Sequence, residues 1–381
     1  MDIKIQISQR LIKAREDAGL SQTDVADNLG IVRQTYARFE QGESSPDITQ
    51  IITLSHVFDK PLGYFYDCDE NTFRFAMRAD SPDLLDSKLR NNLIEKLKNL
   101  HSIEEAAGLS QAEEMPGSMP LFTANEADLL RVEDKARSER NRLGIGSATC
   151  VGDIVSILET ADIRVIPFQK DPKENQKLDG FSAFNEKYGT AIFVNSHPSI
   201  CTERQIFSIC HEYGHLIFHR DEYDGPDQNY RTRGRGASPE EKIANHFAAC
   251  FLIPADALRR QFAMTGGGWA YEETIMRLKR IFRVSAVCMI DRLAKTRLIN
   301  QQNARVLWAT AQKKGWKVCE PQPSPERLAY DGRLLALARK AWELDAASES
   351  FIGELLELDR KALSQLIKQW YNEKGVSNDA L

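Results

Sequence analysis

The stretch His211-Glu212-Tyr213-Gly214-His215 decides how the rest of this 381-residue sequence is interpreted. Its two histidines are four residues apart, so on a helix they lie on one face, about one turn apart. Both imidazoles can then reach one metal ion, and Glu212 can reach a water molecule beside that ion. This is the H-E-x-x-H spacing of two zinc ligands and a general base. Apolar residues dominate positions 205–219, which predicts a buried helix.

Chance alone can also produce a motif of three fixed positions in a long chain. The setting of this motif argues against chance, because two histidines and a carboxylate lie on a mostly apolar helix. Burying ionisable groups costs folding free energy unless a charged partner or a metal compensates. The sequence therefore favours a metal site over a purely structural explanation.

A catalytic zinc ion needs a third protein ligand. His219 lies eight residues after His211, roughly 12 Å along an unbroken helix, which is too far for one ion. Glu241 is a better candidate, because alanines follow it at helical spacing and would let two helices approach closely. Ser238 and Glu241 also fit a capping box, in which Glu241 would serve only the helix end.

Two other residues of the same segment remain alternative ligands. Glu240 is the carboxylate next to Glu241, and His246 follows five residues later. Spacing favours Glu241 but does not exclude either of them.

The stretch from Arg204 to His219, followed by Glu241 to Pro254, resembles the ImmA/IrrE family of zinc metallopeptidases. The family pattern is an H-E-x-x-H helix, then E-x-x-A-N-x-F-A-A, an apolar run and a proline. The resemblance implies that His211, His215 and Glu241 hold one Zn²⁺ per chain and that Glu212 is the catalytic base. It also favours Glu241 over Glu240 and implies a small sheet whose edge strand takes the substrate backbone.

Residues 1–66 form a second recognisable segment. Helical spacing predicts five short helices, and Gly30 makes the tight turn of a helix-turn-helix. The stretches 19–22, 29–31 and 39–42, with Pro46, resemble the XRE family of DNA-binding domains. That resemblance implies a third helix in the major groove of double-stranded DNA. The implied contact residues are Arg33, Gln34, Thr35 and Arg38 at bases or phosphates, and Gln22 at the backbone.

The charge of this segment argues against strong DNA binding. Residues 1–66 hold seven Lys/Arg and nine Asp/Glu, whereas affinity for DNA depends largely on neutralising phosphates. A weak binder that gains affinity as a homodimer fits this composition, and so does a module that binds protein.

The expected fold class is α+β, in four parts. Residues 1–67 form an all-α five-helix domain, 68–120 a connecting segment, 121–300 a mainly helical zincin-like domain with a small sheet, and 301–381 a helical region whose default role is to cap the core. Strands are expected at 73–78, 163–168, 180–185 and 190–195. Helices are expected beyond the motifs at 83–100, 124–143, 154–159, 276–282, 284–293, 326–344 and 348–371, with linkers at 115–120 and 319–325. Tyr223 or Tyr230, in a polar loop, could stabilise an oxyanion, although a tyrosine in such a loop is more commonly a surface residue without that role.

Composition excludes several classes of protein. The hydrophobic fraction of 42% suits ordinary globular cores, and the net charge of −5 gives no global nucleic-acid signature. Seven scattered cysteines without C-x-x-C spacing indicate reduced thiols. No apolar run approaches the length of a membrane span and the N-terminus lacks signal-peptide features. We therefore expect a cytoplasmic protein without a membrane partner.

Together the motifs predict a transcription-linked zinc metallo-endopeptidase. By the resemblance, it would cleave a protein partner such as a repressor or an antitoxin, and so derepress stress, prophage or mobile-element genes. The alternative is a DNA-binding regulator or antitoxin whose peptidase-like domain senses or binds a partner without cutting it.

Overall fold

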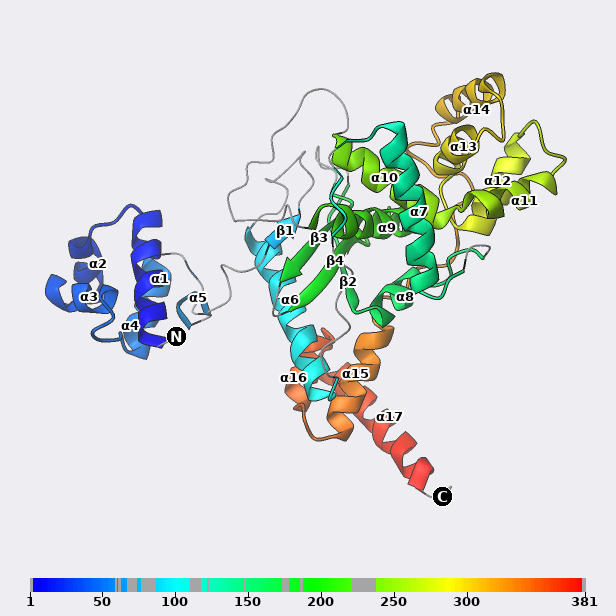
Figure 1. Cartoon of the computed structure of the whole chain (residues 1–381). Helices are drawn as coiled ribbons and strands as arrows, with labels where there is room; N and C mark the ends of the chain where they lie inside the picture. Colours follow the sequence, from blue (N-terminus) through cyan, green and yellow to red (C-terminus); the bar gives the residue numbers. More distant parts are fainter. Residues whose placement is uncertain are drawn as a thin grey trace. The chain divides into compact units, whose positions relative to one another are not determined.

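The structure is a computed structural model, shown in Figure 1, that divides into two compact units, Met1–Phe73 and Arg74–Leu381. The residues it describes are 3–58, 60, 63–66, 74–76, 87–109, 118–121, 123–146, 149–172, 178–185, 188–220 and 238–378. The predicted oxyanion loop with Tyr223 and Tyr230 lies outside them, as do the ends of the predicted strand 73–78, the start of the predicted helix 83–100 and the first half of the predicted linker 115–120.

Five helices make up the first unit, as predicted: α1 Ile3–Asp17, α2 Gln22–Leu29, α3 Arg33–Glu40, α4 Ile48–Val57 and α5 Gly63–Tyr66. Ser21 begins α2 with a capping box to Asp24. Gly30 ends α2 in the left-handed conformation, at φ +66°, and sets the turn into α3. The unit has its own core, which includes Leu11, Val25, Tyr36, Leu54 and Phe65.

The second unit is built around a four-stranded sheet of order β1-β3-β4-β2, with β1 Arg74–Ala76, β2 Ile163–Phe168, β3 Gly180–Asn185 and β4 Gly189–Asn195. β2 pairs with β4 in parallel, and the other pairs are antiparallel. The sequence left the edge strands undecided, and the structure shows that they are β1 and β2. Since β1 pairs with β3, residues 74–76 belong to the sheet. The finer division at 67, 120 and 300 stays a prediction.

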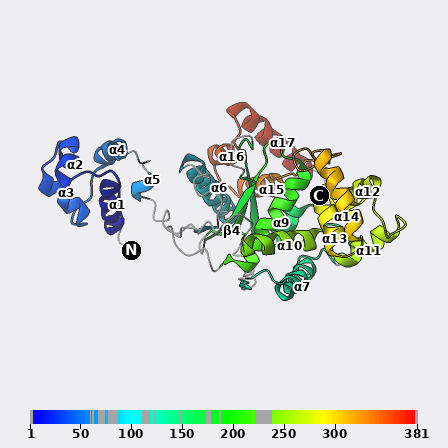
Figure 2. The ribbon, with the colours of Figure 1, turned by 90° about the horizontal axis from the view of Figure 1, so that it is seen from above.

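Three helices contact this sheet: α6 Ser87–Ala106, α8 Ile154–Thr160 and α9 Thr202–Phe218. Two more, α7 Glu126–Arg142 and α10 Pro239–Leu252, pack beyond α9. α9 lies against β3 and β4, while α10 runs beside α9 and also contacts α7, as Figures 1 and 2 show. Apolar residues of α9 and α10, among them Ile209, Leu216, Phe247 and Phe251, are fully buried. The H-E-x-x-H helix is therefore the centre of the core, as its composition predicted.

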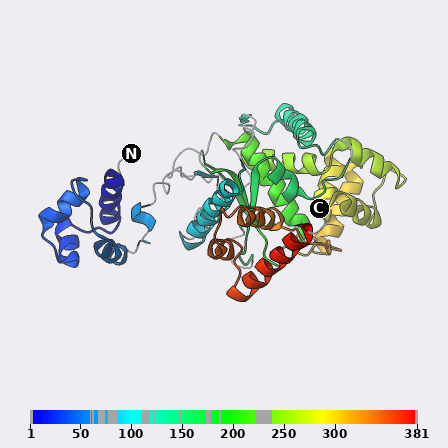
Figure 3. The same ribbon diagram turned by 90° about the horizontal axis from the view of Figure 1, so that it is seen from below.

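The chain ends in helices α11 Ala255–Ala263, α12 Glu272–Phe282, α13 Ala286–Lys295, α14 Gln301–Lys313, α15 Gly332–Glu343, α16 Glu349–Leu355 and α17 Arg360–Asn378. The predicted helix 348–371 is two helices, because Glu357 has a positive φ of 52° and Asp359 caps the start of α17 through the amide of Ala362. α15 and α16 contact α6, which Figure 3 shows from below. None of the described helices has the length and apolar character needed to cross a membrane.

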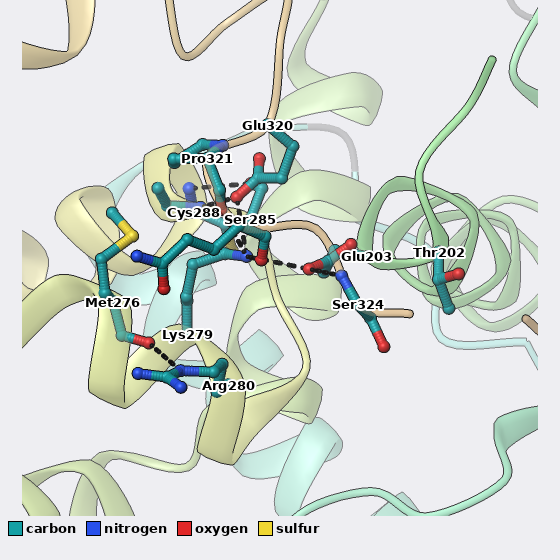
Figure 4. A network of polar contacts seen from close by, with 12 residues as sticks. Thr202, Glu203, Met276, Lys279, Arg280, Ser285, Cys288, Glu320, Pro321 and Ser324 are labelled. Atoms are coloured by element: carbon teal, nitrogen blue, oxygen red, sulfur yellow. Dashed lines mark hydrogen bonds and ion pairs between the residues drawn. The ribbon is translucent and has the colours of Figure 1, made fainter. Parts of the chain in front are cut away.

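A buried polar network fastens the segment after α14 to the start of α9 (Figure 4). The Lys279 ammonium, fully buried, lies 2.8 Å from Glu203 and 3.1 Å from Glu320. It also donates to the carbonyls of Pro321 and Gln322 at 3.1 and 3.0 Å. The predicted linker 319–325 is thus held against α9 and α12 by a charged cluster.

Candidate metal centre

Three side chains from two helices converge on one point in the second unit. His211 Nε2 and His215 Nε2, both on α9, are 3.1 Å apart. The Glu241 carboxylate, from the first turn of α10, lies 3.5 Å from His211 Nε2 and 3.3 Å from His215 Nε2. The arrangement brings together the three residues that the resemblance predicted as ligands.

These spacings suit a zinc ion. Zinc bonds to nitrogen and carboxylate oxygen are about 2.0–2.1 Å long and roughly tetrahedral, which places ligand atoms roughly 3.3 Å from one another. The three measured separations, 3.1, 3.3 and 3.5 Å, surround that value. The donor set of two imidazoles and one carboxylate is also that of hydrolytic zinc sites, which keep a fourth position open. The residues present therefore fit the metal.

Glu241 reaches this point because the cap of α10 does not use its side chain. The Ser238 hydroxyl accepts the backbone amide of Glu241 at 3.3 Å, so only the main chain of Glu241 takes part in the cap. Burial alone would raise the pKa of the Glu241 carboxyl, but hydrogen bonds from His211 and His215 outweigh burial and hold it well below its usual value. The carboxylate is thus anionic, as a metal ligand must be.

The second nitrogen of each histidine also has a partner. His211 Nδ1 lies 3.1 Å from Asn245 Oδ1, and His215 Nδ1 lies 3.0 Å from His219 Nδ1. Burial and the neighbouring His215 lower the pKa of His219 to about 3, so its ring is neutral and can accept a hydrogen bond. Such partners orient a ligating imidazole and fix which nitrogen faces the metal.

Glu212 is buried between the helix and the sheet. Its Oε2 accepts a hydrogen bond of 3.0 Å from Ser182 Oγ on β3. Gly180, on the same strand, faces the Glu212 side chain closely enough that a Cβ there would lie 3.5 Å from Glu212 Cγ and 2.8 Å from the carbonyl oxygen of Phe193. β3 therefore positions this carboxylate.

Gly214, inside the motif, lets α9 and α10 approach each other. A Cβ at this position would lie 3.2 Å from the Ala244 Cα and 3.1 Å from the Phe247 ring. The small residues predicted to allow close helix contact are thus found at the contact itself. This approach is what brings Glu241 within reach of the histidines.

The alternative ligands lie elsewhere. Glu240 is not among the described residues that converge on the histidines, and His219 contacts His215 only through Nδ1. His246 Nε2 lies 3.5 Å from Cys250 Sγ in a separate group with Glu133. The Glu133 carboxylate already pairs with Arg292 at 2.8 Å.

The predicted DNA-contact residues lie on α2 and α3. Arg33, Gln34 and Arg38 are exposed, and Thr35 is half-buried. Gln22 bridges the two helices, since its amide nitrogen donates to Glu40 at 2.7 Å and its oxygen accepts from Arg33 at 3.3 Å. The structure thus brings Gln22 and Arg33 together. Gln34, Thr35 and Arg38 lie on α3 with Arg33.

Sequence reasoning missed two residues of the site. Asn245 stood inside the recognised E-x-x-A-N pattern, and its place four residues after Glu241 on a helix was a signal that it faces the same side. Ser182 carried no local signal, because its contact with Glu212 depends on how β3 packs against α9.

Comparison with known families agrees with both resemblances. Residues 159–294 match the family described as an IrrE N-terminal-like domain, a peptidase family, and residues 11–65 match a helix-turn-helix family. The chain therefore carries an XRE-type helix-turn-helix domain followed by an ImmA/IrrE-like peptidase domain, as predicted.

Several curated regulators are similar to part of the chain. The uncharacterized HTH-type transcriptional regulator YqaE of Bacillus subtilis is 36% identical over 72 residues, 19% of this chain and 62% of that protein. The HTH-type transcriptional regulator ImmR of the same species is 27% identical over 95 residues, 25% of this chain and 70% of that protein. The cryptic phage CTXphi transcriptional repressor RstR of Vibrio cholerae is 23% identical over 128 residues, 34% of this chain and 92% of that protein.

These matches have limited reach. The chain spans less than two thirds of the length of YqaE and of three further HTH-type regulators. A solved structure, the apo form of the competence regulator ComR from Streptococcus vestibularis, aligns over 98% of this chain and 99% of that chain at 11% identity. Its TM-score is 0.17, which does not indicate a shared fold.

Proposed function

We propose that this protein is a DNA-binding transcription regulator whose second unit is a zinc metallo-endopeptidase. It cleaves a protein partner, such as a repressor or an antitoxin, and thereby derepresses stress, prophage or mobile-element genes. The observation that carries the proposal is the convergence of His211, His215 and Glu241 within 3.5 Å of one another, beside the buried carboxylate of Glu212.

In this proposal His211, His215 and Glu241 hold one Zn²⁺, with Asn245 and His219 orienting the two imidazoles. When bound, the ion supplies Lewis acidity that polarises the scissile carbonyl and acidifies a water molecule. Glu212 takes the proton from the attacking water and passes it to the leaving amine. The hydrogen bond from Ser182 to Oε2 keeps the Glu212 carboxylate in one orientation.

The first unit places the peptidase on DNA. α3 presents Arg33, Gln34, Thr35 and Arg38 to the major groove, and Gln22 contacts the backbone beside it. Similarity of part of the chain to ImmR and RstR, named as a regulator and a repressor, supports this role. A protein that carries a repressor-like domain and a peptidase site can find its target among proteins bound to the same DNA.

The experiment compares the full chain with Glu212→Gln, using as candidate substrates any helix-turn-helix or toxin-like proteins that the genes beside its own encode. Cleavage is followed by mass spectrometry and bound zinc by elemental analysis. We expect Glu212→Gln to keep its zinc and to cleave about 10²- to 10⁴-fold more slowly, the usual contribution of a general base. We expect Glu241→Gln to lose zinc, while the matched variant Glu240→Gln keeps both zinc and activity.

The same variants separate this function from its alternative, in which the peptidase-like domain senses or binds a partner without cutting it. If Glu212→Gln controlled a reporter gene as well as the unaltered protein did, with the partner remaining intact, the regulator would act without proteolysis. The proposal requires that derepression and cleavage be lost together.

A further inference from the structure

A cavity of about 540 Å³ lies in the second unit, away from the metal centre. Its lining residues come from α6, the edge strand β2, α8 and the C-terminal helices α15, α16 and α17. Figure 3 shows α15 and α16 beside α6. Small-molecule sites usually enclose about 300–1,000 Å³, so the cavity is large enough for one.

Most of the lining is apolar and part of it faces water. Leucines of the C-terminal region line one side, and none of them is fully buried: Leu334, Leu335, Leu355, Leu356, Leu358 and Leu366. Leu335, for example, is 39% exposed. Apolar surface gathered in a concave site marks a place where something binds.

The opposite wall favours a small molecule over a peptide. Three consecutive residues of β2, Val165, Ile166 and Pro167, line the cavity. Since successive side chains of a strand point to opposite faces, three in a row mean that the strand presents its edge. A peptide that added to this edge would lack one ladder hydrogen bond, because Pro167 has no amide hydrogen.

The charged groups of the lining are mostly acidic. It contains four carboxyl groups, from Glu159, Asp331, Glu354 and Glu357, and one cation, Lys96. Lys96 Nζ already lies 2.6 Å from Glu357 Oε1. An anionic ligand would therefore meet net repulsion and no free cation in the lining, whereas a cationic ligand would be attracted.

Glu159 is the acidic group best placed to receive a cation. It has no hydrogen-bond or ion-pair partner in the part of the chain that the structure describes. Burial raises its pKa to about 7, an effect that the charge of Arg333 opposes and those of Asp153 and Glu104 reinforce. Arg333 is itself bound to Glu104 at 2.6 Å. The half-buried Glu159 carboxyl group lines the cavity, and a bound ammonium group would supply it with a charged partner.

We propose that this cavity binds a small apolar molecule that carries one protonated amine. The apolar part lies between β2 and the C-terminal leucines, and the ammonium group pairs with the Glu159 carboxylate. The site does not depend on proteolysis, and it gives the C-terminal helices a ligand-binding role that the proposed peptidase activity does not require.

Calorimetric titration of the full chain with three matched probes tests this site. Octylamine, octanol and octanoate share one apolar chain and differ in the charge of the head group. At pH 8 we expect octylamine to bind about tenfold more tightly than octanol, a difference worth about 1.4 kcal/mol. We expect octanoate to bind more weakly than octanol. Equal binding of octylamine and octanol, tighter binding of octanoate, or no binding of octylamine would each overturn the proposal.

Two variants locate the binding. Glu159→Gln should weaken octylamine about tenfold, to the level of octanol, and leave octanol unchanged. Glu349→Gln, which removes an exposed carboxylate of α16 outside the lining, should change neither. Leu366→Trp should narrow the cavity and weaken binding of both probes, with circular dichroism and the melting temperature reporting that it folds. Unchanged binding of both probes to the folded Leu366→Trp protein would place the ligand elsewhere.

Discussion

At the scale of single residues, zinc affinity should depend on both ring nitrogens of His211, the one that faces the candidate metal centre and the one that faces away from it. His211 presents Nε2 to Glu241 and Nδ1 to Asn245 Oδ1, at 3.5 and 3.1 Å. Removing such an outer partner from a metal-binding histidine typically lowers metal affinity about 10- to 100-fold. We expect Asn245→Ala to weaken zinc binding by that factor, measured by competition with a chromophoric chelator.

The conservative variant distinguishes this role from simple packing. Asn245→Asp keeps an oxygen acceptor for His211 Nδ1, so its zinc affinity should stay within about threefold of the original, because carboxylates serve zinc-bound histidines in the same way. Asn141→Ala, at an exposed position of α7, is the matched control and should have no effect. An Asn245→Ala protein with unchanged zinc affinity would show that Asn245 does not orient His211.

The ionisation of a second residue, Glu159, should make the free energy of unfolding depend on pH. Burial raises its pKa from 4.5 to about 7 in the folded protein. The folded state therefore holds the proton more tightly than the unfolded state. The stability that this provides is fully present below about pH 4.5 and is lost as the pH rises through about 7. We expect Glu159→Gln, which cannot ionise, to escape this loss.

Urea unfolding at several pH values measures the effect. Relative to the original protein, Glu159→Gln should gain stability between pH 5 and pH 8. The gain should be on the order of 1 kcal/mol, after discounting for the partial exposure of the side chain. A constant difference across this range would mean that Glu159 titrates normally in the folded protein.

At the scale of elements, the sequence predicted what depends on local pattern. The five N-terminal helices and the three strands 163–168, 180–185 and 190–195 were all expected, and the helix around residues 211–215 begins three residues earlier than expected, at Thr202. Capping residues and periodic apolar positions determine such elements, and both can be read locally. The candidate ligand Glu241 was predicted from spacing and resemblance, and its carboxylate lies beside the two histidines.

What escaped prediction depends on contacts between distant segments. The pairing of β1 with β3 joins residues about a hundred positions apart, and no local pattern encodes it. The same holds for Ser182 and Glu212, and for Lys279, whose partners Glu203 and Glu320 lie far away on either side. The break between α16 and α17 was missed because Glu357 carries a left-handed conformation that a non-glycine residue rarely signals.

The buried ion pairs of Lys279 with Glu203 and Glu320 should contribute strongly to the stability of the second unit. Lys279→Met would leave Glu203 and Glu320 buried without their cation, and breaking a buried pair in this way costs about 3–5 kcal/mol. Lys314→Met, which removes a partly exposed ion pair with Glu272, should cost less than about 1 kcal/mol. Urea unfolding of both variants measures the contrast.

Neutralising Glu203 and Glu320 in the Lys279→Met protein distinguishes the stability lost through unpaired charge from the stability lost through packing. Adding Glu203→Gln and Glu320→Gln to Lys279→Met removes the uncompensated carboxylates, so part of the lost stability should return. If the triple variant were no more stable than Lys279→Met alone, the loss would come from the missing lysine stem and its bonds to the carbonyls of Pro321 and Gln322.

At the scale of the whole molecule, each unit has the means to act by itself. The first unit has its own core around Tyr36 and Phe65, and the second contains both the candidate metal centre and the apolar cavity. DNA binding, peptide hydrolysis and ligand binding would thus be assigned to separate surfaces. Variants in one should leave the others unchanged unless the two units communicate.

The acidic composition of the first unit affects how its DNA binding can be tested. With seven basic and nine acidic residues in 1–66, the unit gains little from general attraction to phosphates. Specific contacts must then carry more of the affinity. We expect Arg33→Ala to weaken binding to DNA from upstream of its own gene by about 1–3 kcal/mol, the value of one good base contact. Fluorescence anisotropy measures this at fixed salt.

Lys13→Ala is the matched control, since it removes one positive charge from the same unit at an exposed position of α1. If α3 reads the DNA, Lys13→Ala should weaken binding less than Arg33→Ala does, because Lys13 lies on α1 and an exposed charge is screened within a Debye length of about 10 Å. Equal losses in the two variants would instead mean that the unit responds only to total charge. The surface of α3 would then be free for a protein partner, which is the other use that its acidic composition allows.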